Sequence, residues 1–296
     1  MNQWFKIAEW HLILAATCFM FFTGLRDDLV KWKPLTLTIM ESIPLLMIVW
    51  MAQLKVVSLG GLLDIYEIPT LGGYFLSFII IYITVRLANR LDQLDGLLAP
   101  IAGFTFLIFG LASALLNLHG YAILCFGMVG SLFGYFKFQS AKCKIVIGKN
   151  GCLLIGFLLG FMSLYLFNVA IMKQDHGYGG FRNLLINIPV TLSFLLFPLF
   201  YYLRRMILFV FFRIPWNHNI GFQQLLLEKG IKKSLIPYLL VMVQAVLIGL
   251  VIIFVYLHIG INLILGILFL FSLLVIWLIG YGLSKTKFKD RIKINL

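Results

Sequence analysis

Charged side chains are scarce in this sequence. Only 12% of its 296 residues are charged, and Asp and Glu together number 11, whereas soluble domains carry about 25% charged residues. Hydrophobic residues make up 62% and the mean hydropathy is +1.02, an excess that the core of a soluble protein cannot absorb. Alternating segments of about ten residues, typical of membrane-spanning strands, are also missing. The sequence therefore predicts an all-α protein embedded in a membrane.

Cysteine is rare, and its few positions form no motif. Cys18, Cys125, Cys143 and Cys152 are scattered without a C-x-x-C pair, so neither disulfides nor a cysteine metal site is expected. A long basic run is missing too, although the net charge is +13. Since proteins that follow a nucleic-acid backbone carry clustered Lys and Arg, we expect no nucleic-acid partner.

No removable secretion signal is expected at the first apolar stretch. The first apolar stretch, residues 10–24, lacks a preceding basic segment and a small-residue cleavage site. Both are needed for a signal peptide. We therefore interpret this stretch as a membrane span.

Long apolar runs, in contrast, recur along the whole chain. Each has the length of about twenty residues that a helix needs to cross a hydrocarbon core about 30 Å thick. We predict a polytopic bundle of about nine transmembrane helices that forms a single membrane domain over residues 1–296. The spans are predicted near residues 10–24, 36–54, 72–88, 98–116, 119–137, 151–171, 187–204, 234–257 and 263–283.

The basic residues predict the orientation of this bundle. Most of the 24 Lys and Arg residues fall in alternate linkers and in the tail, and cytoplasmic loops are enriched in Lys and Arg. This places the N-terminus outside and the C-terminus in the cytoplasm, and makes the chain a multi-pass protein of the cytoplasmic (inner) membrane. The basic tail after residue 283 is expected to lie against anionic membrane lipids. The predicted cytoplasmic linkers are 25–35, 86–97, 137–150 and 205–233.

A pair of glycines predicts one helix contact. Gly156 and Gly160 form a G-x-x-x-G within the span 151–171. Small residues at this spacing let two helix backbones approach closely in a membrane. We therefore expect this span to pack tightly against another.

Acidic residues gather where basic residues are usual. Asp27, Asp28, Asp92 and Asp95 lie at the predicted cytoplasmic ends of the first and third spans. Asn89, Asp92 and Asp95 follow one another at intervals of three, so on a helix they share one face. Such a face can present an amide and two carboxylates to one ligand, which favours a bound cation or a phosphate-processing site.

A purely structural interpretation is also open. The first acidic pair would then cap a helix end beside Arg26 and Lys31. The second pair would offset the charges of Arg86 and Arg90. The spacing of these residues alone does not decide between the two interpretations.

Several segments resemble one family in the same order along the chain. They are residues 24–29 (GLRDDL), 58–62 (SLGGL), 88–97 (ANRLDQLDGL), 138–152 (FQSAKCKIVIGKNGC) and 221–230 (GFQQLLLEKG). Together they resemble the polyprenyl-phosphate N-acetylhexosamine-1-phosphate transferases, glycosyltransferase family 4. This family includes enzymes of the phospho-N-acetylmuramoyl-pentapeptide-transferase and undecaprenyl-phosphate GlcNAc-1-phosphate transferase type. The most specific segment is 88–97, which is similar to the family pattern N-L-x-D-G-L-D-G-L.

The sequence departs from the family at some positions. Gln93 stands where glycine is usual, Lys149 stands where the family has an aspartate, and residues 221–230 lack the family's histidines. The resemblance also implies two helices ahead of the aspartate pair. We therefore expect the chain to be short at its N-terminus by about two helices of the family.

The resemblance implies a reaction and a set of site residues. The family transfers a sugar-1-phosphate from a UDP-amino sugar to a membrane polyprenyl phosphate in cell-envelope glycan synthesis, with release of UMP. Mg²⁺ is the expected cofactor, since it bridges phosphate oxygens and neutralises their charge. By resemblance, the catalytic residues are Asp27, Asp28, Asp92 and Asp95, the substrate-binding residues are Asn89, Lys144 and Lys149, and the metal ligands are Asp92 and Asp95.

Lys149 leaves the activity of the chain open. Replacing a carboxylate ligand by an ammonium repels a divalent cation. In one hypothesis the protein is a transferase in which Lys149 itself pairs a phosphate. In another it is a degenerate relative that binds a polyprenyl phosphate or a partner glycosyltransferase. A third is a transporter, motivated by Glu9, His11 and Glu41 in or near apolar segments. A homodimer is also left open.

Overall fold

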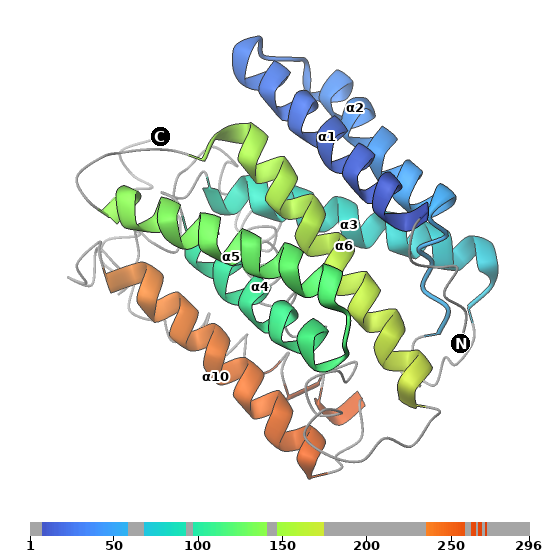
Figure 1. Ribbon diagram of the computed structural model, residues 1–296, viewed down its shortest axis with the longest axis vertical. Coiled ribbons are helices and arrows are strands. Elements are labelled where there is room, and N and C mark those ends of the chain that lie inside the picture. The colour runs from blue at the N-terminus through green and yellow to red at the C-terminus, as the bar shows by residue number, and fades with distance from the viewer. Residues whose placement is uncertain are drawn as a thin grey trace, which may run out of the picture.

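The computed structural model describes eight helical elements. It covers residues 8–58, 68–92, 97–140, 147–174 and 235–257, with the short stretches 262–264, 266–267 and 270. Within these residues all regular structure is helical, which confirms the predicted fold class (Figure 1). The elements are α1 (Ala8–Leu29), α2 (Pro34–Leu46), the π-helix η2 (Met47–Met51), α3 (Thr70–Asp92), α4 (Leu98–Leu115), α5 (His119–Ser140), α6 (Gly148–Gln174) and α10 (Ile236–Tyr256).

Among the described residues, six helical segments are long and apolar enough to cross a membrane, as expected of a multi-pass membrane protein. They confirm the predictions near 36–54, 72–88, 98–116, 119–137, 151–171 and 234–257. The prediction near 10–24 coincides with α1, which is not among the six. The prediction near 187–204 lies outside the described residues, as does most of 263–283. The total of about nine spans and their orientation stay predictions.

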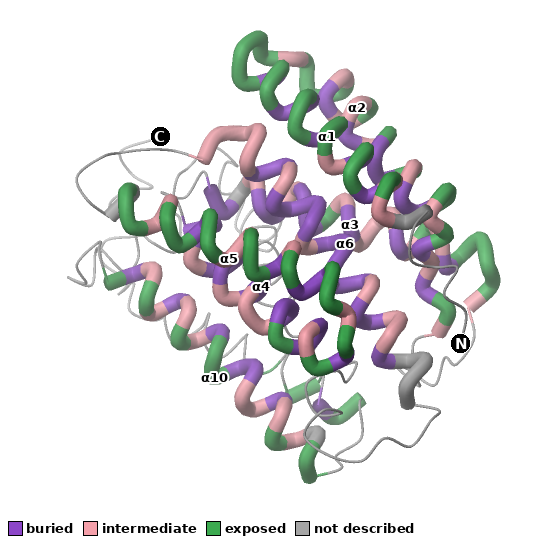
Figure 2. Tube along the Cα trace, in the orientation of Figure 1, coloured by how far each residue is buried: buried purple, intermediate pink, exposed green. Residues whose placement is uncertain are grey.

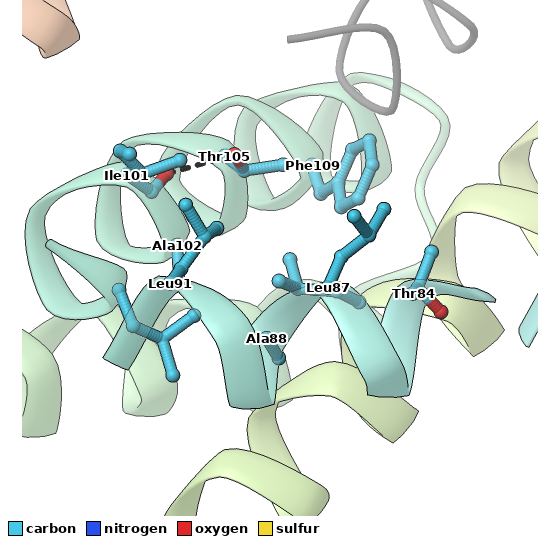
Figure 3. Close-up of a pocket in the computed structure, with 10 residues that line it drawn as sticks. Thr84, Leu87, Ala88, Leu91, Ile101, Ala102, Thr105 and Phe109 are labelled. Atoms are coloured by element: carbon cyan, nitrogen blue, oxygen red, sulfur yellow. Dashed lines mark hydrogen bonds between the residues drawn. The ribbon is translucent and has the colours of Figure 1, made fainter. Parts of the chain in front are cut away.

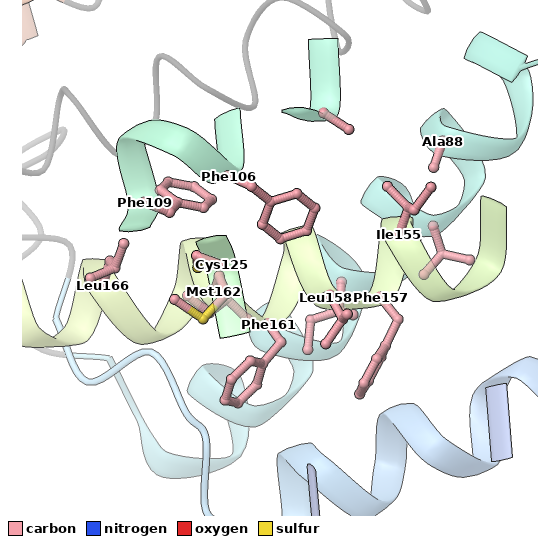
Figure 4. Packing of buried hydrophobic residues seen from close by; sticks show 14 of the residues in the cluster. Ala88, Phe106, Phe109, Cys125, Ile155, Phe157, Leu158, Phe161, Met162 and Leu166 are labelled. Carbon is pink, nitrogen blue, oxygen red and sulfur yellow. The ribbon is translucent and has the colours of Figure 1, made fainter. Parts of the chain in front are cut away.

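α6 is the central helix of the described bundle. It packs against α1, α3 and α4, and 72% of its apolar window is buried, compared with 22% for α5. Aromatic side chains from α4 and α6 fill the space between the helices, among them Phe106, Phe109, Phe157 and Phe161 (Figure 4). The outer faces of α1, α2, α5 and α10 are largely exposed (Figure 2), and in a membrane protein such apolar faces meet lipid.

The glycine pair brings two helix backbones into contact. A Cβ atom added to Gly156 would meet the Cα atom of Val85, and one added to Gly160 would meet Thr84 and Ile81. All three neighbours lie on α3. The predicted close packing of this span is therefore confirmed, and its partner is α3.

A tight connection joins α1 to α2. The carboxylate of Asp27 accepts a hydrogen bond from the backbone N–H of Trp32 at 2.9 Å, across the connecting residues. Pro34 then occupies the first turn of α2, where its missing N–H costs nothing and its fixed φ suits the helix. The connection thus holds the end of α1 in a defined position beside α6.

Candidate active site at the first turn of α6

Asp28 caps α6 from a different helix. Its Oδ1 accepts the backbone N–H of Lys149 and its Oδ2 that of Asn150, both at 3.0 Å. The first N–H groups of a helix have no partner within the helix, and negative charge is favoured there. Gly148 opens the helix with φ +74°, and an added Cβ would lie 3.1 Å from Asp28 Oδ2. Because Gly148 has no side chain, Asp28 of α1 can approach the start of α6 closely.

The cap makes a prediction about stability. Asp28→Ala should lower the free energy of unfolding by about 1 kcal/mol, because two N–H groups of α6 lose their acceptor. Thermal unfolding of the purified protein in detergent measures this. Ser131→Ala is the control, since that exposed hydroxyl bonds only to Met128 of its own helix and should change stability by less than about 0.5 kcal/mol. Equal effects of the two variants would contradict the cap.

Asp27 forms an ion pair with Lys149. The Lys149 Nζ lies 2.8 Å from Asp27 Oδ2, and the two side chains are 31% and 8% exposed. Burial raises the pKa of Asp27. The hydrogen bond from Lys149, the Trp32 amide and the charges of Lys149 and Lys31 outweigh burial and hold this pKa below its ordinary value. Asp27 is therefore ionised and weakly basic.

Asp92 has the opposite electrostatic character. It is buried at the end of α3, and its Oδ1 has no hydrogen-bond partner in the described part of the chain. Burial raises the pKa of Asp92; hydrogen bonds with the Cys152 thiol and the Ile147 backbone lower it, and the charge of Asp28 raises it again, with a net increase. A carboxylate with a raised pKa is better matched to accept a proton near neutral pH.

The structure thus brings four of the predicted residues to one place. Asp27, Asp28 and Asp92 all contact the first turn of α6, and Lys149 belongs to it. Asn89 lies one turn before Asp92 on α3, and its Nδ2 is buried without a partner among the described residues. The remaining predicted residues, Asp95 and Lys144, lie outside the described residues.

Two further polar residues at this turn were missed by the sequence analysis. Asn150 lies against Gly24 of α1, and its Oδ1 is buried without a described partner. Cys152 contacts Asp92. The only available signal was their closeness in sequence to Lys149, which does not distinguish a site residue from its neighbours.

The structural interpretation of the acidic residues is partly confirmed. Asp28 does cap a helix, but the helix is α6. Arg86 does not offset Asp92 as that interpretation predicted. It pairs instead with Glu41 of α2, whose carboxylate lies 2.9 Å from Arg86 Nη2.

The Glu41–Arg86 pair lies within two candidate spans. Glu41 is fully buried, and Arg86 also donates to Thr38 at 2.7 Å and lies over the ring of Tyr82 at 4.9 Å. The contact is a charge pair by distance, since neither Glu41 oxygen makes a hydrogen bond with favourable angles. His11 is exposed, and the side chain of Glu9 lies outside the described set. Glu41 thus has a structural partner, so its charge within a span does not by itself indicate transport.

The described carboxylates do not fit a Mg²⁺ ion. Mg²⁺ requires near-octahedral oxygen coordination. Asp27 is paired with an ammonium, and both oxygens of Asp28 accept backbone N–H groups. Of the three carboxylates at the first turn of α6, Asp92 alone keeps an oxygen without a hydrogen-bond partner among the described residues. Among the residues that the structure describes, no group of three or more His, Cys, Asp or Glu could hold a metal.

An apolar cavity lies between α3, α4 and α6 (Figure 3). It extends along α3 from Thr84 to Leu91, next to Asp92. The hydroxyls of Thr84 and Thr105 donate to the backbone of their own helices. The lining therefore suits hydrocarbon, and the charged cluster is the better place for a nucleotide or a phosphate.

Comparisons with known proteins identify the family of the chain. The sequence model of glycosyl transferase family 4 matches residues 10–167, which include Asp27, Asp28, Asp92 and Lys149. The chain is 27% identical to a phospho-N-acetylmuramoyl-pentapeptide-transferase of Prochlorococcus marinus (strain MIT 9301) over 242 residues, which is 75% of this chain and 64% of the relative.

Other relatives carry the same name. The enzyme of Prochlorococcus marinus (strain MIT 9215) is 29% identical over 54% of this chain and 42% of its own length. That of Limosilactobacillus reuteri (strain DSM 20016) is 35% identical over 32% of this chain and 31% of its own length. The chain thus matches less than two thirds of each relative. Since the family model covers more than half of the chain, the protein belongs to glycosyl transferase family 4.

Proposed function

We propose that this protein transfers an N-acetylhexosamine-1-phosphate from a UDP-sugar to a membrane polyprenyl phosphate, in cell-envelope glycan synthesis. The observation that carries this proposal is the convergence of Asp27, Asp28, Asp92 and Lys149 on the first turn of α6. These residues come from three helices, and all lie within the part of the chain that matches the family. A structural role alone does not account for the Asp92 oxygen that has no hydrogen-bond partner in the described part of the chain.

The reaction requires two anionic phosphates to approach each other. An oxygen of the carrier phosphate attacks the phosphorus that bears the sugar, and the bond from that phosphorus to the UMP oxygen breaks. Asp92 is the proposed acceptor of a proton from the carrier phosphate, because its raised pKa suits this task. The Lys149 ammonium offsets negative charge on the transferred phosphate.

The position of the cluster suits these substrates. It lies at the C-terminal ends of α1 and α3 and at the start of α6: Asp92 follows the candidate span Thr70–Asn89, and Lys149 belongs to the first turn of Gly148–Ala170. A membrane edge is where a nucleotide sugar from water and a lipid phosphate at headgroup depth can meet. We propose that this edge faces the cytoplasm and that residues 1–296 form one membrane domain, with a homodimer left open.

The direct test is a transfer assay with the purified protein. Radiolabelled UDP-GlcNAc or UDP-MurNAc-pentapeptide is incubated with undecaprenyl phosphate, with and without Mg²⁺, and the lipid-soluble product is counted. We expect labelled lipid that depends on the carrier, with equimolar release of UMP. No product with either donor under either condition would contradict transfer.

A second candidate function is carrier binding without transfer. The specific observation behind it is Lys149, whose ammonium stands where the family has an aspartate and is bound to Asp27. An inert parent that binds radiolabelled undecaprenyl phosphate, together with turnover gained by Lys149→Asp, would favour this candidate. An active parent would exclude it.

A further inference from the structure

Lys149 is held at its backbone and at the end of its side chain. Its backbone N–H donates to Asp28 Oδ1 at 3.0 Å, and its Nζ lies 2.8 Å from Asp27 Oδ2. Asp27 cannot turn freely, because its other oxygen accepts the N–H of Trp32. The ammonium is therefore fixed between α1 and the start of α6, and does not extend freely into water.

We propose that Lys149 is the resident cation of this site, aimed by Asp27 at a substrate phosphate, and that phosphate binding here requires no divalent metal. The proposal rests on the function proposed above, which it deepens. An ammonium has three N–H donors, and Asp27 is the acceptor described for one of them. Because the Lys149 side chain is 31% exposed, the remaining donors can meet a ligand.

The contacts of Asp27 and Asp28 favour a cationic side chain of the protein over a bound metal ion. A divalent ion near Asp27 would face the Lys149 ammonium at contact distance and would have to displace it. It would also compete with the two backbone N–H groups at the N-terminus of α6 for the oxygens of Asp28. The ion pair and the cap therefore already occupy the carboxylates that a metal would use.

This arrangement changes the expected role of Asp27. The resemblance implied that Asp27 is a catalytic residue. A carboxylate that is ionised, paired and lowered in pKa is a poor base at neutral pH. Asp27 is instead a positioning residue that acts on the phosphate through Lys149.

The first experiment measures phosphate binding without turnover. Inorganic pyrophosphate is titrated into the purified protein in EDTA, with binding followed by calorimetry. We expect saturable binding by the parent, with an affinity that changes by less than about twofold when the titration is repeated without EDTA and with MgCl₂ in excess over pyrophosphate. Lys149→Met should weaken binding by about tenfold or more, the scale of one lost charge-assisted contact. Lys137→Met, the matched control at the end of α5, should bind like the parent.

The second experiment uses Mn²⁺ as a spectroscopic probe of the cation position. Electron paramagnetic resonance of free Mn²⁺ should show no saturable site in the parent or in Lys137→Asp, and a new site in Lys149→Asp.

The third experiment tests the positioning role of Asp27. Asp27→Asn should weaken pyrophosphate binding and Asp27→Glu should restore it, with thermal unfolding used to confirm that both variants fold. A merely structural role would not give this rescue.

Defined outcomes overturn the proposal. They are pyrophosphate binding by the parent that requires Mg²⁺, absence of pyrophosphate binding, unchanged affinity in a folded Lys149→Met variant, or a saturable Mn²⁺ site in the parent. Failure of the proposed function looks different. Sugar-phosphate transfer that depends strictly on Mg²⁺ would support the transferase function and refute Lys149 as the resident cation. Metal-free pyrophosphate binding without any transfer product would support Lys149 as the resident cation and refute the transferase function.

Discussion

Asp92→Asn is expected to reduce sugar-1-phosphate transfer by about a hundredfold or more, the usual contribution of a general base. The amide keeps the size of the carboxylate but cannot accept the proton of the carrier phosphate. The measurement is kcat at saturating UDP-sugar and undecaprenyl phosphate. Because burial raises the pKa of Asp92 above the ordinary 3.8, the parent should lose activity on acidification at a pH above that value, as the base becomes protonated.

Asp290→Asn provides the matched control for this substitution. It makes the same chemical change in the basic C-terminal tail, to which we assign no catalytic role, and should leave kcat within about twofold. Full activity of a folded Asp92→Asn variant would remove Asp92 from the reaction. Retained activity with a higher KM would instead indicate that Asp92 only binds substrate.

Arg86→Met is expected to lower the free energy of unfolding by about 3 kcal/mol. The change leaves Glu41, which is fully buried in α2, without its partner, and removal of one member of a buried charge pair costs about 3 to 5 kcal/mol. The lower end applies here because Glu41 can take up a proton. The measurement is thermal unfolding in detergent, calibrated by reversible unfolding in denaturant.

The double variant Arg86→Met/Glu41→Gln separates pairing from other effects of Arg86. It removes both charges, so we expect it to be more stable than Arg86→Met alone. Lys55→Met is a control, because Lys55 also lies over a tyrosine ring, at 5.8 Å from the centroid of Tyr74, but should contribute only about 0.5 to 1 kcal/mol. If the effects of Arg86→Met and of Glu41→Gln, each measured alone, add up to that of the double variant, Glu41 and Arg86 are not coupled.

The sequence predicted the helices well because apolar run length is a direct consequence of bilayer thickness. Six predicted spans coincide with helices of suitable length, and Gly156 and Gly160 indicated a close contact. The identity of the partner helix was not predictable, since the glycines specify only their own side of the contact. The Glu41–Arg86 pair was missed for the same reason, because its members lie on different spans and share no local pattern.

The candidate site was predicted as a set of residues but not as a network. The motif around Asp27 and Asp28 and the one around Asp92 identified the carboxylates that meet at α6. Their hydrogen-bond partners depend on tertiary packing: Asp28 and the α6 amides are separated by 121 and 122 positions. The sequence therefore predicted that Lys149 repels a metal, but not the ion pair with Asp27 that the structure shows.

The contact of Gly156 and Gly160 with α3 has a mechanical consequence. Where two backbones touch, no layer of side chains can change rotamer to absorb a displacement, so sliding or rotating α6 against α3 would drive it into Ile81, Thr84 and Val85. The two helices behave as one stiff body, and Asp92 on α3 keeps a constant relation to the first turn of α6. A substrate must therefore match a cluster whose dimensions were set when the helices packed.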